Sequence, residues 1–207
     1  MKKYMIMAVL LLTSMATFAQ SKSSKTDASK FEIRLRGIAA IPPSNSYTLS
    51  STSHVNISTS VVPELDFTYF FTKNIAAELI LGTTHHKVAA KSEGKTQLGT
   101  VWLLPPTLNV QFHYPVQNFE PYIGVGVNYT IFYGVKDDAA KLKYKNNVGF
   151  STQLGFDYKL NNKWSINLDV KKIFLKTDVT IKGTVPTVLS NVKVDPFIIG
   201  LGVGFRI

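Results

Sequence analysis

The feature that most constrains this chain is a repeated alternation of apolar and polar side chains that begins at Phe31. Successive side chains of a strand point to opposite faces, so a period of two predicts strands with one apolar face. We count eight such stretches, separated by polar, turn-rich segments. The predicted strands are Phe31–Ile41, Ser60–Thr72, Ile75–Thr84, Val101–Tyr114, Phe119–Tyr133, Asn147–Leu160, one that begins at Trp164, and Lys193–Ile207.

The seventh stretch contains one irregularity. Ile166, Leu168 and Val170 alternate with polar residues, and the alternation then loses its phase near Lys172. One extra residue in a strand produces such a slip, so the sequence predicts a β-bulge there.

The connections between the predicted strands alternate in length. Alternation of residues alone also fits a soluble β-sandwich. Short turns at one end and long loops at the other are typical of outer-membrane barrels, as are aromatic side chains near strand ends. We therefore predict an all-β fold: an eight-stranded antiparallel transmembrane β-barrel of the up-and-down, outer-membrane type. The expected turns are residues 73–74, 115–118 and 161–162, and the expected long loops are residues 42–59, 85–100, 134–146 and 178–192.

Residues 1–19 have the order of a secretory signal peptide. Two lysines precede an apolar stretch too short to cross a bilayer as a helix, and Thr17-Phe18-Ala19 places small residues at the −3 and −1 positions. The alternative is an uncleaved N-terminal membrane helix. We expect cleavage before Gln20, a flexible Ser- and Lys-rich leader over residues 20–30 and the barrel over residues 31–207.

The predicted export and strand count determine the expected location. After the leader, no apolar run reaches the roughly 18 residues of a membrane-spanning helix, and a closed barrel is the other structure that satisfies every backbone group in lipid. We expect the bacterial outer membrane, and an even number of strands predicts that both termini are periplasmic.

Composition excludes some classes of chemistry and favours some partners. The chain has no cysteine, which excludes disulfides, zinc–thiolate sites and a lipoprotein anchor. Its formal charge is +10 at pH 7, and basic proteins can bind nucleic acid, but export makes nucleic acid an unexpected partner. Outer-membrane lipids, including lipopolysaccharide, are the expected partners.

Several motifs resemble those of the outer membrane protein W family. Leu104-Pro105-Pro106-Thr107-Leu108, followed by PYIGVGVNYT at residues 121–130, is similar to the central motifs of that family, and residues 65–87 and 194–207 also resemble it. The resemblance implies a narrow outer-membrane barrel that passes small hydrophobic or amphipathic molecules, in part sideways from the lumen into the membrane. One departure is Ile207, where the family ends in Phe, which leaves Phe205 as the aromatic signal for the barrel-insertion machinery.

The polar faces of the predicted strands carry many charges. An eight-stranded barrel has an interior just wide enough for its own side chains, and buried charges are costly unless they are paired. One interpretation is a paired network that plugs the lumen, and the other is a polar conductance path. The residues of this predicted lumen charge network are Glu32, Arg34, Arg36, Glu64, Asp66, Glu78, Asp157, Asp169, Lys171 and Arg206.

Prolines and glycines mark further candidate features. Pro105 and Pro106 cannot donate hydrogen bonds to a neighbouring strand, so they either create a lateral opening or simply begin a strand. The inward glycines either leave parts of the lumen wall open or relieve strand curvature. These glycines are Gly124, Gly126, Gly155, Gly200, Gly202 and Gly204.

The sequence offers little to suggest an enzyme. No nucleophile motif is present, and we expect no catalytic residues, no cofactor and no metal site. The neighbours His85 and His86 point to opposite faces of a strand, so they cannot readily share one ion.

The long loops offer two further features. They are rich in lysine, which either forms a solvated surface or contacts lipopolysaccharide phosphates, and residues 137–144 are expected to form a short helix. Apolar loop residues would line an entrance: Ile57, Leu98, Trp102 and Leu189. We expect a porin-like channel for small hydrophobic or amphipathic solutes, and the alternative is a closed structural or surface-binding barrel.

Overall fold

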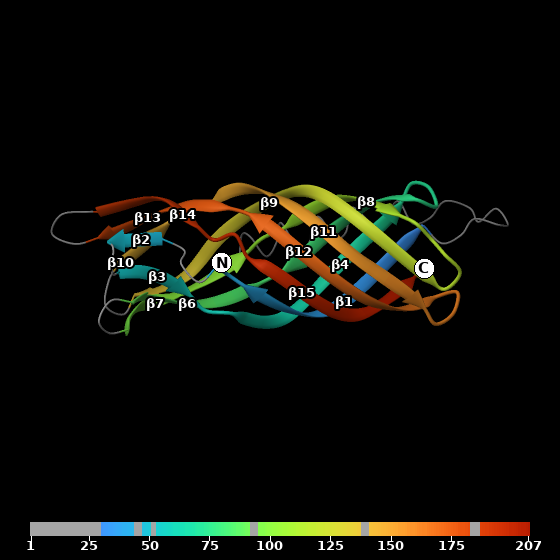
Figure 1. The fold of residues 1–207 in the computed structure, drawn as a ribbon, viewed down its shortest axis with the longest axis horizontal. Helices are drawn as coiled ribbons and strands as arrows, with labels where there is room; N and C mark the ends of the chain where they lie inside the picture. The colour runs from blue at the N-terminus through green and yellow to red at the C-terminus, as the bar shows by residue number, and fades with distance from the viewer. Residues whose placement is uncertain (1–29, 44–46, 51–52, 92–94, 138–140, 183–186) are drawn as a thin grey trace, which may run out of the picture.

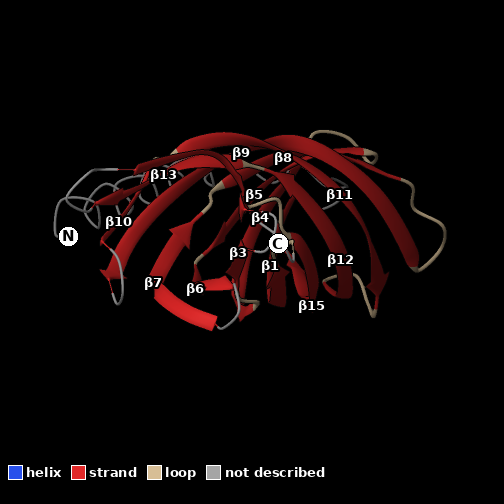
Figure 2. Ribbon diagram, turned by 60° about the vertical axis from the view of Figure 1, so that its left-hand side comes forward, coloured by secondary structure: helices blue, strands red, loops and turns tan. Residues whose placement is uncertain are grey.

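The computed structural model describes residues 30–43, 47–50, 53–91, 95–137, 141–182 and 187–207 (Figure 1). Every regular element in these residues is a β-strand, and the strands curve around a common interior (Figure 2). None of the described residues belongs to a helix long and apolar enough to cross a membrane. The predicted signal peptide and nearly all of the leader lie outside the described residues.

Eight strands form a closed antiparallel barrel. They pair in the order β11-β12-β15-β1-β4-β5-β8-β9, and the pairing of β9 with β11 closes the ring. This confirms the predicted eight-stranded barrel. The strands are β1 (Phe31–Ile41), β4 (Ser60–Phe70), β5 (Ile75–Gly82), β8 (Thr107–His113), β9 (Phe119–Asp137), β11 (Asn147–Lys159), β12 (Trp164–Phe174) and β15 (Phe197–Arg206).

The three tight turns and the last residue of the chain lie at one end of the barrel, here called the short-turn end (Figure 1). The turn after β4 is closed by a hydrogen bond from Phe71 N to Ile75 O of 2.9 Å, and the turn after β11 by one from Leu160 N to Trp164 O of 2.9 Å. Ile207 N donates to Phe31 O over 2.8 Å. The pairing of the first and last barrel strands therefore continues to the short-turn end of the barrel.

At the opposite end, here called the loop end, the segments predicted as long loops contain further strands. β2, β3, β6 and β7 continue the barrel sheet beyond β9, and β10, β13 and β14 form a second sheet. The predicted helix at residues 137–144 is wrong, because β9 reaches Asp137 and β10 pairs with β13; residues 138–140 lie outside the described residues. The additional strands are β2 (Tyr47–Ser50), β3 (Ser53–Ile57), β6 (Thr84–Lys91), β7 (Lys95–Leu104), β10 (Lys141–Tyr144), β13 (Lys176–Lys182) and β14 (Thr187–Lys193).

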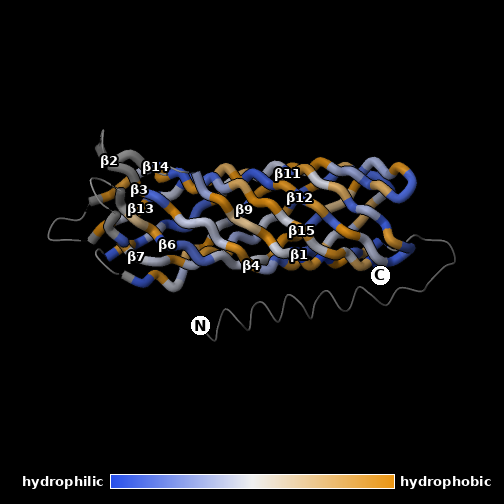
Figure 3. Tube along the Cα trace, turned by 60° about the horizontal axis from the view of Figure 1, so that its bottom comes forward, coloured by the Kyte–Doolittle hydropathy of each residue, from blue (hydrophilic) through white to orange (hydrophobic). Residues whose placement is uncertain are grey.

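The barrel is apolar outside and, towards the short-turn end, polar inside. In β1, Leu35 is 54% exposed, whereas its neighbours Arg34 and Arg36 are buried. The same alternation of hydropathy runs along the other barrel strands (Figure 3). Aromatic contacts occur near both ends, between Trp164 and Phe205 and between His85 and Trp102. This distribution is the reverse of a water-soluble protein and matches a wall surrounded by lipid.

The predicted β-bulge near Lys172 is wrong. β11 and β12 stay in regular register from Phe150↔Phe174 to Lys159↔Ser165. Lys171 and Ile173 point inward and are buried, and Lys172 between them is only half-buried. The direction of the side chains therefore continues to alternate, and the lumen itself changes from polar to apolar at this level.

The space beside the inward glycines is filled rather than open. A Cβ atom on Gly155 would lie 2.5 Å from the Tyr122 hydroxyl oxygen, and one on Gly204 would lie 2.7 Å from Glu32 Oε1. A Cβ atom on Gly202 would collide with the backbone of Leu35 and lie 2.7 Å from Arg36 Cα. These glycines allow neighbouring atoms to approach closely, and they do not open the wall.

Gly202 and Gly37 provide a test of this close packing. Gly202→Ala should destabilise the barrel by about 1–3 kcal/mol, the usual cost of overpacking. Gly37, at the neighbouring register position on the outer face, has no atom closer than 4.0 Å to an added Cβ, so Gly37→Ala should leave stability nearly unchanged. Urea unfolding of the two refolded variants in micelles measures both values, and equal losses would contradict the packing argument.

Candidate functional site

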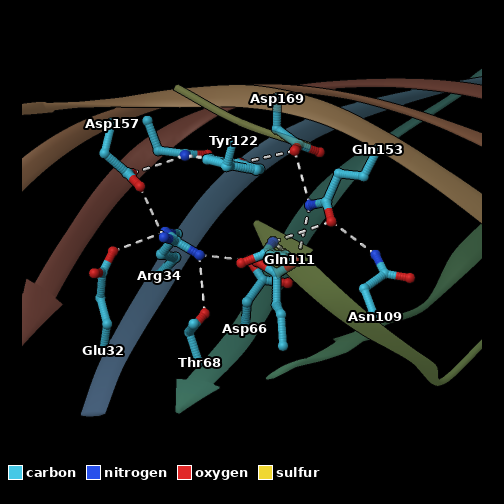
Figure 4. Close-up of polar contacts among 12 residues, drawn as sticks. Glu32, Arg34, Asp66, Thr68, Asn109, Gln111, Tyr122, Gln153, Asp157 and Asp169 are labelled. Carbon is cyan, nitrogen blue, oxygen red and sulfur yellow. Dashed lines mark hydrogen bonds and ion pairs between the residues drawn. The ribbon is translucent and has the colours of Figure 1, made fainter. Parts of the chain in front are cut away.

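The lumen has two levels of different chemistry. Towards the short-turn end it is filled by a network of charged and amide side chains, here called the polar plug, part of which is drawn in Figure 4. The structure brings all ten residues of the predicted lumen charge network together in this half of the barrel. Beyond the plug, towards the loop end, the inward side chains are mostly apolar and surround two adjoining cavities.

Two arginines of β1, Arg34 and Arg36, organise the plug. They are two residues apart in the strand, so both side chains point into the lumen. The Arg34 guanidinium lies 2.8 Å from Glu32 Oε1, 3.0 Å from Glu78 Oε1 and 2.8 Å from Asp157 Oδ2 (Figure 4). It also donates to Thr68 Oγ1 over 2.9 Å. One cation therefore joins carboxylates from β1, β5 and β11.

Arg36 and Lys171 hold the upper layer of the plug. Arg36 lies 2.7 Å from Asp66 Oδ2, 2.6 Å from Glu78 Oε1 and 3.2 Å from Asp169 Oδ1. Lys171 Nζ lies 2.5 Å from Glu64 Oε1 and 3.0 Å from Asp169 Oδ1. These side chains are almost fully buried, and pairing with hydrogen bonds is the condition under which buried charges are tolerated.

Arg206 extends the network to the rim of the short-turn end. Its guanidinium lies 2.7 Å from Glu32 Oε2. Glu120, which the sequence analysis did not single out, lies at the same rim. Its Oε1 atom is 3.0 Å from His113 Nδ1, and its Oε2 atom forms an ion pair with Lys159 Nζ. Alternation within the predicted strand Val101–Tyr114 directs His113 inward, but nothing in the sequence indicates that Glu120 is its partner.

Neutral side chains that the sequence analysis also missed complete the plug. Gln153 Nε2 donates to Glu78 Oε2 and to Asp169 Oδ2, each over 2.8 Å, and Tyr122 donates its hydroxyl to Asp169 over 2.8 Å. Gln111 Nε2 donates to Glu78 Oε2 over 2.8 Å. Cations and amides thus share the carboxylate oxygens, so the plug is a dense hydrogen-bonded layer.

The two cavities form an apolar path above the plug. The upper cavity is lined mainly by apolar residues of the loop end, and the lower cavity reaches down to Glu64 and Lys171. Both linings include His86, Leu103 and Val194, so the cavities adjoin. They are narrow, with a volume of about 40 Å³ for the upper cavity and about 50 Å³ for the lower cavity.

Three of the four predicted entrance residues line the upper cavity, namely Ile57, Leu98 and Leu189. Trp102 does not. It pairs with His85 and Tyr133 on the outer wall, with ring centroids 4.6 and 6.3 Å away. Its position is explained by strand parity, because the inward positions of β7 on either side of it are Val101 and Leu103.

The strand ladder is interrupted at Pro105 and Pro106. Pairing of β5 with β8 stops at Ile80↔Thr107, and pairing of β6 with β7 resumes at Thr84↔Leu103. On the β9 side, Tyr129 N still donates to Pro106 O over 3.0 Å. The interruption therefore lies mainly between residues 81–83 and 104–106, and Gly82 and Pro105 both line the lower cavity there.

The two neighbouring histidines point to opposite sides of the wall. His85 contacts Trp102 outside, whereas His86 is buried and uses both ring nitrogens within the protein, on Ser58 O at 2.6 Å and Thr84 Oγ1 at 3.0 Å. Among the described residues, no group of three or more His, Asp or Glu side chains is placed to hold a metal ion.

Comparisons with known proteins agree with this architecture. The model of the OmpW family matches residues 28–207. An uncharacterized outer-membrane protein, y4mB, of Sinorhizobium fredii is 41% identical over 94% of this chain and 87% of its own length. Outer membrane protein W of Salmonella typhi is 32% identical over the full length of both chains. The crystal structure of the outer membrane protein OprG from Pseudomonas aeruginosa superposes with a TM-score of 0.78 at 26% identity, over 87% of this chain and 96% of that one.

Arg36 provides a test of the plug. Arg36→Met should lower the free energy of unfolding by about 3–5 kcal/mol, because it leaves buried carboxylates without their counter-charge. Lys159→Met, at the partly exposed rim, should cost about 1 kcal/mol or less. Urea unfolding in micelles compares the two variants, and a loss at Arg36 no larger than at Lys159 would show that the network does not depend on this arginine.

Proposed function

The chain belongs to the OmpW family of outer-membrane proteins, and from that premise we propose that it forms a narrow channel for small hydrophobic or amphipathic molecules. The observation that carries the proposal is the apolar path, which runs from the loop end through the upper and lower cavities and ends on the polar plug. A polar solute would gain no hydrogen bonds along most of this lining, whereas an apolar one would leave water.

The plug determines where such a solute can leave. A hydrophobic molecule that reached Glu64 and Lys171 would have to separate buried ion pairs to continue towards the short-turn end. The interrupted ladder beside Gly82 and Pro105 lies at the same level and faces lipid. We therefore place the exit sideways, between residues 81–83 and 104–106, and the solute passes from the lower cavity into the bilayer.

This proposal includes an orientation. The loop end lies outside the cell and receives the solute, and the short-turn end, with both termini, lies in the periplasm. Short periplasmic turns and longer external connections are the usual arrangement of bacterial barrels.

The lateral exit is tested by a disulfide across the interruption. The register on both sides places Thr83 opposite Leu104, and the chain has no other cysteine. In liposomes that contain refolded protein, a small hydrophobic fluorophore should enter faster than in empty liposomes, with little ion conductance. Oxidised Thr83→Cys/Leu104→Cys should reduce this uptake towards the level of empty liposomes, and a reducing agent should restore it.

The matched control joins β5 to β8 below the interruption, where the ladder is intact. Leu79 pairs with Leu108, so oxidised Leu79→Cys/Leu108→Cys should leave uptake unchanged. Unchanged uptake in the stapled Thr83–Leu104 variant would exclude the lateral exit. Wild-type uptake no faster than in empty liposomes, from protein shown to be folded, would overturn the channel itself.

A second candidate function, contact with lipopolysaccharide, is favoured by an arrangement of like charges. Lys176 of β13 lies directly opposite Lys193 of β14, and both are exposed. Like charges in this position destabilise a strand pair, and none of the ion pairs among the described residues includes either lysine. Phosphate groups of lipid A would neutralise them, and exposed Lys143 of neighbouring β10 adds to the same sheet.

Lipid A binding tests this second function. Lys176→Gln/Lys193→Gln should retain less lipid A than the wild type when refolded protein is washed in detergent and examined by native mass spectrometry. Lys73→Gln/Lys163→Gln removes the same charge at the short-turn end and should not change retention. Equal retention by both double variants, or loss of lipid A to inorganic phosphate at millimolar concentration, would argue against a lipid A site.

A further inference from the structure

The lower cavity has one apolar wall and one polar wall. Ile38, Ile80 and Ile173 belong to the apolar wall. The polar wall consists of Thr107, Asn128 and Thr130, which are buried and lie beside the interrupted ladder, and the ion pair of Glu64 and Lys171 forms the floor; these five residues line the same cavity. A cavity of this kind fits a molecule with a tail and a head better than a plain hydrocarbon.

The side-chain hydrogen-bond donors of the polar wall are all engaged within the protein. Thr130 Oγ1 donates to Asn128 Oδ1 over 2.6 Å, and Asn128 Nδ2 donates to Thr107 Oγ1 over 2.7 Å and to Pro105 O over 3.2 Å. Thr107 Oγ1 in turn donates to Pro105 O over 3.0 Å. A hydroxyl group has one donor and two acceptor positions, so the groups that remain on Thr107 and Thr130 are acceptors.

The floor does not favour a negatively charged head. Lys171 is already paired with Glu64 and Asp169. Among the ten residues of the predicted lumen charge network, six carboxylates face four cations, so no positive charge is left over for an anion. A charged head of either sign would also lose its hydration on entering this buried space.

We propose that the lower cavity is a head-group site for a neutral hydrogen-bond donor, such as the hydroxyl of a medium-chain alcohol, with the tail in the upper cavity. The inference rests on the proposed channel function and names its solute class. Thr130 and Thr107 accept the hydrogen bond of the head, the adjoining apolar lining around Leu103 holds the tail, and the site lies where the solute would turn towards the lateral exit.

The test compares three probes with the same tail on the full-length barrel in lipid nanodiscs. The probes are 1-octanol, octane and ionised octanoate, at equal concentration in the lipid. Contact is read from nuclear Overhauser effects between each probe and the labelled δ-methyl groups of Ile80 and Ile173. Octanol should occupy the cavity about three- to ten-fold more tightly than octane, the value of one net hydrogen bond, and octanoate should bind more weakly than octanol.

Conservative variants assign the preference to the two threonines. Thr107→Val/Thr130→Val keeps the side-chain volume and removes both acceptors, so the preference for octanol over octane should fall to about one. Thr177→Val makes the same substitution in the upper cavity, where the proposal places the apolar tail rather than the head, and should leave the preference unchanged.

The outcomes separate this site from the channel. Octane or octanoate binding at least as tightly as octanol would overturn the head-group site and leave the channel proposal standing. The same holds if the double valine variant retains the wild-type preference. If none of the three probes contacts Ile80 or Ile173, no solute reaches the lower cavity, where the proposed exit begins, and the channel proposal fails together with the site.

Discussion

The structure depends on the requirement that every backbone amide and carbonyl group in lipid has a hydrogen-bond partner within the protein. Pairing of β9 with β11 leaves the eight-stranded ring without a free edge, and the bond from Ile207 N to Phe31 O joins the end of the last strand to the start of the first. The interruption at Pro105 and Pro106 stands out for this reason. It is a place where the wall lacks part of its backbone ladder, which is the reason for placing the proposed exit there.

Closing eight strands also fixes the width of the lumen, and the width determines its chemistry. The interior has room for little more than its own side chains, so charges that point inward must find partners across the barrel. Arg34 and Arg36 do this by contacting carboxylates from several strands. The filled space beside Gly155 and Gly202 follows from the same crowding.

The alternation of apolar and polar residues gave correct predictions for features that depend only on whether a side chain points into or out of the barrel. The eight strands, the inward charges and the opposite directions of His85 and His86 follow from parity. The errors occurred where a partner decides the outcome. Pairing with β13 makes a strand of Lys141–Tyr144, where a helix had been predicted. The bulge at Lys172 was inferred on the assumption that polar residues always face the lumen. Trp102 was assigned to the entrance by its apolar character, although its parity directs it outward. The partners of Glu120 and Asp169 include Lys159 and Arg36 on other strands, and the direction of a side chain alone does not select its partner among the inward residues.

The change from polar to apolar lining gives the proposed channel its direction. If the plug filled the whole lumen, no solute could enter, and if the apolar lining ran to the short-turn end, a hydrophobic solute would emerge into periplasmic water. Here the lining changes at Lys171, and Pro105 borders the same cavity. A molecule that descends the apolar path therefore meets a floor of paired charges and a weakened side wall at one level. Since lipid lies behind that wall, the step that avoids both water and buried charge is the sideways one.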